Sequence, residues 1–174
     1  MLGDVFWVEG LLSTIYDVFL DQIIDGQIYT KAAGERDPAR EHWTRLQELN
    51  LADNALLIFD RGYYSKELYE DLVSNGCNVL MRLRKDNKFC KLGSDDFSWT
   101  ATSANGKPIL YRVVKVPLPQ KSKEANEYLV TNIINPSISP SLLYNLYFER
   151  WNIETKIQGT KRLVGTGRIY RDKL

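Results

Sequence analysis

The stretch ALLIFDRG at residues 55–62 decides the fold, because five apolar residues run without a break and stop at Asp60, Arg61 and Gly62. A short apolar run without polar alternation is typical of a strand buried on both faces of a sheet. In open α/β sheets, ligands bind at the ends of such strands. A carboxylate buried there costs free energy unless a cation or a hydrogen-bond donor satisfies it. Asp60 is therefore a candidate site residue, and the alternative is an Asp that only caps the following turn.

Sequence signals on both sides of this strand predict an α/β fold. Over residues 11–84 the order is strand, strand, helix, strand, helix, strand, which indicates a mixed sheet. Asp37 as an N-cap before Pro38 predicts a helix start, and Ser65 can cap the second helix, which Gly76 is placed to end. In chain order, the predicted segments are residues 11–19, 22–30, 38–49, 55–59, 66–75 and 78–83.

Residues 85–134 differ in character and predict a β-rich insertion. Polar turns, Asn105-Gly106 among them, separate four short segments with strand composition, and no helical pattern is found there. The predicted strands are residues 88–92, 98–103, 109–117 and 128–134. We therefore expect a core of residues 1–84 and 135–174, with an inserted β subdomain over residues 85–134.

The helix predicted over residues 140–163, capped by Ser139, carries four polar residues on one face. They are Tyr147, Arg150, Glu154 and Lys161. Their spacings of three, four and seven residues place them within roughly 60° of one another around the helix axis. The row is a candidate functional surface. The alternative is a set of exposed ion pairs, which contribute only ~0.3–0.5 kcal/mol each.

Composition limits the class of protein. The hydrophobic share of 44% suits a globular core, and no apolar run has the length of a membrane helix. The N-terminus does not have the pattern of a secretory signal. Cys77 and Cys90 form no C-x-x-C pair, and His42 is the single histidine, so we expect two free thiols and no zinc set.

Charge is distributed unevenly although the formal net charge is only +1. Acids gather in residues 1–37, and bases gather in residues 147–174. A second basic cluster comprises Arg82, Arg84, Lys85, Lys88 and Lys91. Separate acidic and basic regions can hold a cation and a polyanion in neighbouring places, and the alternative is solvated surface charge.

Two carboxylates far apart in the sequence, Asp60 and Glu154, suggest a metal site. Mg²⁺ takes oxygen ligands and keeps positions for water and substrate phosphates. Two such ions can activate a water or hydroxyl and stabilise the leaving oxygen of a phosphodiester. Arg150 and Lys161 would then bind the DNA backbone, while Tyr147 would stack on a base or hydrogen-bond a phosphate.

These residues resemble a known family. The series Tyr-x2-Arg-x3-Glu-x6-Lys over residues 147–161 matches, at every spacing, the signature of one group of bacterial insertion-sequence DDE transposases. The segment LIFDRGY at residues 57–63 resembles the second-aspartate motif of that group, and RWNIE at residues 150–154 resembles its Arg-Trp-x-x-Glu core. The resemblance covers nearly the whole chain.

The resemblance implies an RNase H-like α/β fold, a mixed sheet with flanking helices and an inserted β-rich subdomain. It implies that Asp60 and Glu154 are catalytic ligands of Mg²⁺, for which Mn²⁺ would substitute. It also implies DNA contacts from Tyr147, Arg150 and Lys161. The parent enzyme would cut and join transposon ends in double-stranded DNA by two-metal hydrolysis and transesterification. It would act in a paired-end complex of identical subunits, in the bacterial cytoplasm at the nucleoid.

The chain departs from the family near its start. The family's first catalytic aspartate ends a strand well upstream of the position of Tyr16, and none of the early aspartates fits that place. Those aspartates are Asp4, Asp17, Asp21 and Asp25. We therefore expect the first aspartate to be absent, so that the chain alone would be inactive. Two alternatives stay open: an inactive remnant that binds DNA or an intact transposase, and an RNase H-like nuclease without strand transfer.

Overall fold

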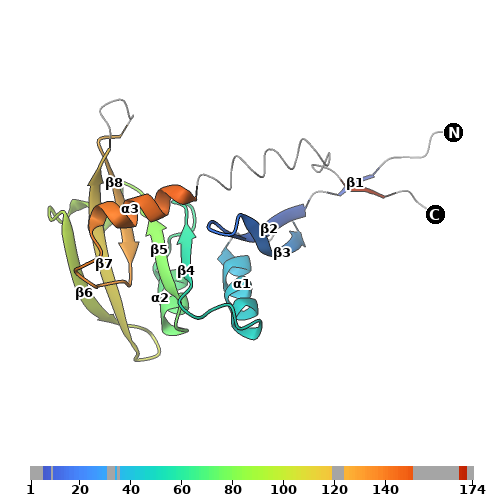
Figure 1. The fold of residues 1–174 in the computed structure, drawn as a ribbon, viewed down its shortest axis with the longest axis horizontal. Coiled ribbons are helices and arrows are strands. Elements are labelled where there is room, and N and C mark those ends of the chain that lie inside the picture. The colour runs from blue at the N-terminus through green and yellow to red at the C-terminus, as the bar shows by residue number, and fades with distance from the viewer. Residues whose placement is uncertain are drawn as a thin grey trace. The chain divides into compact units, whose positions relative to one another are not determined.

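The computed structural model describes residues 6–8, 10–30, 34, 36–118, 124–150 and 169–171 of the chain. The chain divides into two compact units (Figure 1). The first unit contains Met1–His42 and Glu149–Leu174, and the second contains Trp43–Phe148.

Two antiparallel strand pairs lie in the first unit. β2 (Gly10–Asp17) pairs with β3 (Gln22–Thr30), and β1 (Phe6–Val8) pairs with β9 (Ile169–Arg171). The Asp17 carboxylate accepts hydrogen bonds from the backbone N–H groups of Phe19 and Leu20, each 2.9 Å long. This turn ends β2 at Asp17, so the two strands predicted over residues 11–19 and 22–30 are confirmed, with the first ending earlier than predicted, and they pair as a hairpin.

A buried histidine holds the start of α1 (Arg36–Glu48) on this hairpin. His42 Nδ1 lies 2.6 Å from Asp25 Oδ2, and His42 Nε2 lies 2.9 Å from Ser13 Oγ. His42 and Asp25 are both buried. Buried polar groups need hydrogen-bond partners, so this short network fixes the first turns of α1 against β2 and β3.

The start of α1 corrects one prediction. The helix begins at Arg36, so Asp37 is not its N-cap. Asp37 lies in the first turn, where a negative charge interacts favourably with the helix dipole, and its carboxylate is 3.0 Å from Arg40 Nη1. Asn50 has a φ of 56° just beyond the helix, which is the conformation that commonly ends one.

A five-stranded mixed sheet forms the second unit, in the order β4-β5-β8-β7-β6. β4 and β5 are parallel, and all other neighbours are antiparallel. The strands are β4 (Leu56–Phe59), β5 (Asn78–Arg82), β6 (Asp96–Thr102), β7 (Pro108–Pro117) and β8 (Asn126–Thr131). The strands from residues 85–134 thus continue the sheet that β4 and β5 begin.

Helices α2 (Lys66–Ser74) and α3 (Pro140–Glu149) cover opposite faces of this sheet (Figure 1). Leu143 of α3 packs in a core that includes Val114 of β7. Tyr69 of α2 stacks on Tyr111 of β7, with ring centroids 4.5 Å apart. Residues 111 and 114 point to opposite faces, because side chains alternate along a strand. The mixed sheet with flanking helices confirms the predicted fold class.

The caps of both helices follow the sequence. Ser65 Oγ accepts the N–H of Leu68 at 3.1 Å, and Ser139 Oγ accepts the N–H of Leu142 at 3.2 Å. Gly76 follows α2 with a φ of 82°, a left-handed conformation that glycine adopts without strain. These polar contacts fix where each helix meets the sheet.

The predicted strand over residues 88–92 is wrong. A 3-10 helix, η1 (Lys88–Lys91), occupies this segment instead. Its cap is the Asn87 side chain, which accepts the N–H of Phe89 at 3.0 Å. The local hydrogen bond of an asparagine competes with strand pairing, which explains the difference. The other three strands predicted after residue 85 are confirmed as β6, β7 and β8, with β8 ending at Thr131.

Candidate active site

Asp60 directly follows β4, where the backbone turns away from the sheet. The turn is closed by the N–H of Tyr63, which donates to the carbonyl of Asp60 at 3.1 Å. The hydroxyl of Tyr147, on α3, donates to Asp60 Oδ1 at 2.8 Å. Tyr147 is only 1% exposed, so its hydroxyl is held in place by the surrounding core. The contact joins residues that are 87 positions apart in the sequence.

A buried arginine ends the neighbouring strand. Arg82 is the last residue of β5, and Phe59 of β4 is in register with the residue before it. The Nη2 atom of Arg82 lies 2.8 Å from Glu127 Oε1 and 3.2 Å from Glu124 Oε2. Burial alone would lower the pKa of Arg82, but Glu127, Tyr147 and Glu124 outweigh it and raise that pKa above its ordinary value. Arg82 is therefore a permanent cation between these groups.

Glu127, on β8, is a buried carboxylate that sequence reasoning missed. It is 9% exposed, and its Oε2 has no hydrogen-bond partner among the described residues. Burial raises the pKa of Glu127; Arg82 opposes this, whereas the negative charges of Glu124 and Asp60 add to it. The alternation of side chains along the strand could have indicated it. Glu127 lies two residues from the buried Leu129, so both side chains point to the same face of the sheet.

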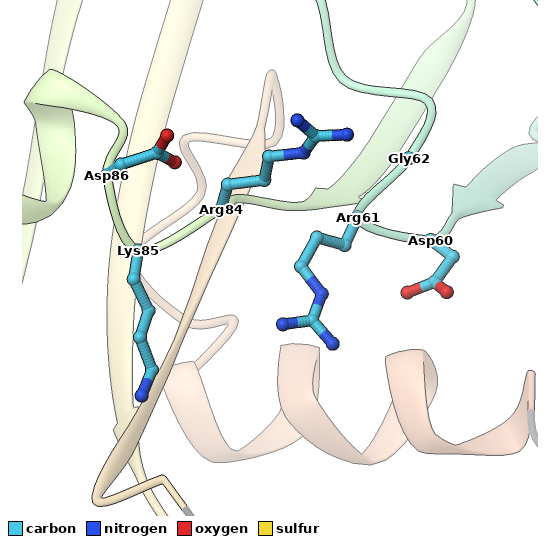
Figure 2. A pocket seen from close by; sticks show the side chains of 6 residues that line it. All are labelled: Asp60, Arg61, Gly62, Arg84, Lys85 and Asp86. Atoms are coloured by element: carbon cyan, nitrogen blue, oxygen red, sulfur yellow. The ribbon is translucent and has the colours of Figure 1, made fainter.

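A polar cavity of about 490 Å³ adjoins Asp60. It is lined by Asp60, Arg61, Gly62, Arg84, Lys85 and Asp86. Figure 2 shows that three of these residues belong to the loop after β4 and three to the neighbouring loop after β5. Part of the basic cluster noted in the sequence therefore lies beside the candidate carboxylate.

The predicted site residues fall into three groups. Asp60 and Tyr147 are brought into direct contact. Arg150 follows the end of α3 and is partly buried. Glu154 and Lys161 lie outside the described residues, as does the part of the predicted helix beyond residue 150.

The donor chemistry around Asp60 fits a hard divalent cation. Carboxylate oxygens are the ligands that Mg²⁺ and Mn²⁺ prefer, and an open polar cavity leaves space for water and phosphate. Asp60 supplies one such carboxylate, at the edge of the cavity. Within the described ranges, no group of three or more His, Cys, Asp or Glu residues is placed to hold a metal ion. Glu154, the second carboxylate predicted from the sequence, lies outside these ranges.

Cys77 and Cys90 are free thiols. In the part of the chain that the structure describes, no helix combines the length and apolarity of a membrane span.

Comparison with known proteins gives the family. The family described as the transposase DDE domain matches residues 7–173, which is almost the entire chain. No curated protein matches the sequence. The family match covers the strand that ends at Asp60 and the segment from Tyr147 to Lys161 together. The chain therefore belongs to the family of transposase DDE domains, which has an RNase H-like fold and a transposase-type function.

Proposed function

We propose that Asp60 and Glu154 are the carboxylate ligands of Mg²⁺ or Mn²⁺ at an active site that cuts and joins transposon-end DNA. The contact between Tyr147 and Asp60, 2.8 Å long, is the observation that carries this proposal. It joins the two motifs that, by the resemblance, belong to one active site. If Asp60 only capped a turn and the helix row only formed exposed ion pairs, these two motifs would have no reason to be in contact.

The residues of the chain have distinct roles in this proposal. Tyr147 fixes the orientation of the Asp60 carboxylate through its hydrogen bond. When bound, divalent ions supply charge stabilisation at the scissile phosphodiester. Arg150 and Lys161 hold phosphates of the DNA backbone, the first as a bidentate fork and the second as a point charge.

The substrate in this proposal is double-stranded DNA that carries transposon ends. Cutting is hydrolysis of a phosphodiester. Joining is attack by the freed 3′ hydroxyl on a phosphodiester of the target strand, whose own 3′ oxygen leaves as a hydroxyl. Both ends are brought together in a complex of identical subunits, at the bacterial nucleoid.

The first experiment is Mn²⁺- or Mg²⁺-dependent nicking of supercoiled plasmid by the purified chain. The chain alone is expected to be inactive, so this assay tests the two carboxylates only where the wild-type chain cuts. We expect Asp60→Asn and Glu154→Gln to abolish any such metal-dependent nicking. Asp86→Asn is the matched control, because Asp86 lines the same cavity but lies outside the proposed ligand set. Nicking that survives in both ligand variants would sink the proposal.

Joining is tested separately. Oligonucleotides with pre-cleaved transposon ends are incubated with target plasmid, and transfer of the labelled end is measured. Transfer that depends on Asp60 and Glu154 supports a transposase, whereas cutting without any transfer favours a simple nuclease.

A further inference from the structure

Three cations converge on one carboxylate beside the candidate active site. Glu124 Oε1 lies 3.4 Å from Arg61 Nη1 and 3.6 Å from Lys85 Nζ. Its Oε2 lies 3.2 Å from Arg82 Nη2. Burial would raise the pKa of Glu124, but Lys85, Arg82 and Arg61 together hold that pKa below its ordinary value. Glu124 is therefore an anion near neutral pH, held by both of its oxygens.

Two of these cations remain accessible to solvent. The side chain of Arg61 is 44% exposed and that of Lys85 is 57% exposed, whereas Arg82 is buried. Both accessible cations line the cavity next to Asp60. An approaching ligand can therefore reach them from the cavity without unfolding the sheet.

Arg84 adds a further cation to the same cavity. Its side chain is exposed, and among the described residues its guanidinium makes no ion pair. Figure 2 shows the guanidinium groups of Arg84 and Arg61 on the two loops that border the cavity. Arg84 therefore faces the cavity with no acidic partner among the described residues.

The cations of this arrangement are of the kind that bind a phosphodiester. A backbone phosphate presents two charged oxygens, as a carboxylate does, and arginine forks and lysine ammonium groups are its usual partners. The cations around the cavity already have acids close by, so an added anion would be repelled by those negative charges. An anion that takes the place of Glu124 avoids the repulsion from Glu124. Glu124 thus places its carboxylate against two of the cations that line the cavity, Arg61 and Lys85.

We propose that Arg61, Arg84 and Lys85 form a binding site for DNA backbone phosphates, which Glu124 occupies when DNA is absent. This inference rests on the proposed function, because it places the DNA strand next to Asp60. It assigns DNA contacts to residues of the loops after β4 and β5, outside the row on the helix from Pro140. It also makes Glu124 an internal competitor of the substrate.

The test is binding of a fluorescein-labelled DNA duplex in EDTA, measured by anisotropy over a range of salt concentrations. We expect Arg84→Gln and Lys85→Gln each to weaken binding by about threefold. Each should also reduce the slope of log affinity against log salt by about 0.9, and the double variant by about twice that. Lys107→Gln, in the β6–β7 turn, is the control for loss of one positive charge.

Glu124→Gln gives the opposite sign. If Glu124 competes with phosphate, this variant binds the duplex more tightly, by about threefold. If Glu124 only organises the cations, the variant binds more weakly, which would overturn its proposed role. Thermal unfolding of every variant separates a change in binding from a loss of the folded state.

Other outcomes are equally decisive. Arg84→Gln and Lys85→Gln variants that behave like Lys107→Gln would refute the phosphate site. Binding of millimolar inorganic phosphate that duplex DNA does not displace would assign the site to a small anion. That result would also refute the proposal. Asp60→Asn should keep the salt slope, so failure of this inference is distinguishable from failure of the proposed function.

Discussion

The hydrogen bond between Tyr147 and Asp60 is a charge-assisted one, because its acceptor is a carboxylate and its donor is a buried phenol. Such bonds contribute more to stability than neutral ones do, and they also fix the carboxylate in one orientation. A carboxylate that binds a metal ion needs that fixed orientation, because the ligand geometry sets the position of the ion.

Replacing Tyr147 tests the strength of this bond. We expect Tyr147→Phe to lower the free energy of unfolding by about 1.5–3 kcal/mol, because a buried hydrogen bond to a charged group is lost. Urea denaturation measures the change. Tyr144→Phe, one turn earlier on α3, is the matched control and should change stability by less than about 0.5 kcal/mol. Equal effects of the two substitutions would contradict the account.

The lowered pKa of Glu124 predicts that the stability of the protein depends on pH. Its folded-state pKa is lowered, so its contribution is present above the unfolded-state pKa, about 4.3, and is lost as pH falls through the folded-state value. We therefore expect Glu124→Gln to flatten the loss of stability below about pH 4.3. Urea titrations across this range, with Glu48→Gln as control, measure the effect. An unchanged acid limb would show that the ion pairs of Glu124 contribute nothing.

Among the elements, α3 has the most direct effect on the site, because it carries both Leu143 and Tyr147 into the core of the second unit. Leu143 is fully buried, whereas its neighbour Leu142 is exposed. The position of Tyr147 over Asp60 therefore depends on how α3 packs on the sheet.

We expect Leu143→Ala to cost about 2–5 kcal/mol, because it leaves a cavity under α3. Leu142→Ala is the matched control, and an exposed substitution of this kind should stay within about 0.5 kcal/mol. Thermal or urea unfolding provides the measurement. Similar losses in both variants would mean that α3 does not pack on the sheet as described.

The elements also show what the sequence could and could not predict. Apolar runs and serine caps located β4, α2 and the start of α3, because each depends on residues that are adjacent in the chain. The strand predicted at residues 88–92 failed because the local hydrogen bond from Asn87 favours a 3-10 turn there. Asp37 failed as a cap because the helix begins at Arg36, two residues before the predicted start.

At the scale of the whole molecule, the site depends on contacts between distant segments. Asp60 and Tyr147 could be proposed as site residues because both belong to motifs with fixed spacing, but the contact between them could not be predicted. Glu127 and Glu124 could not be proposed, because only the pairing of β8 with β5 brings them to Arg82. The division into a core of residues 1–84 and 135–174 and an insertion over residues 85–134 stays a prediction.

The central claim is that Asp60 and Glu154 hold divalent ions at one shared site. Its most direct test is Mn²⁺ binding, measured by calorimetry for Asp60→Asn, Glu154→Gln and the double variant, with Asp86→Asn as control. This measurement needs no catalytic turnover. We expect each single substitution to weaken binding by at least about tenfold, and the double variant to be little worse than either single one. Wild-type affinity in both single variants, or losses that simply add, would contradict a shared metal site.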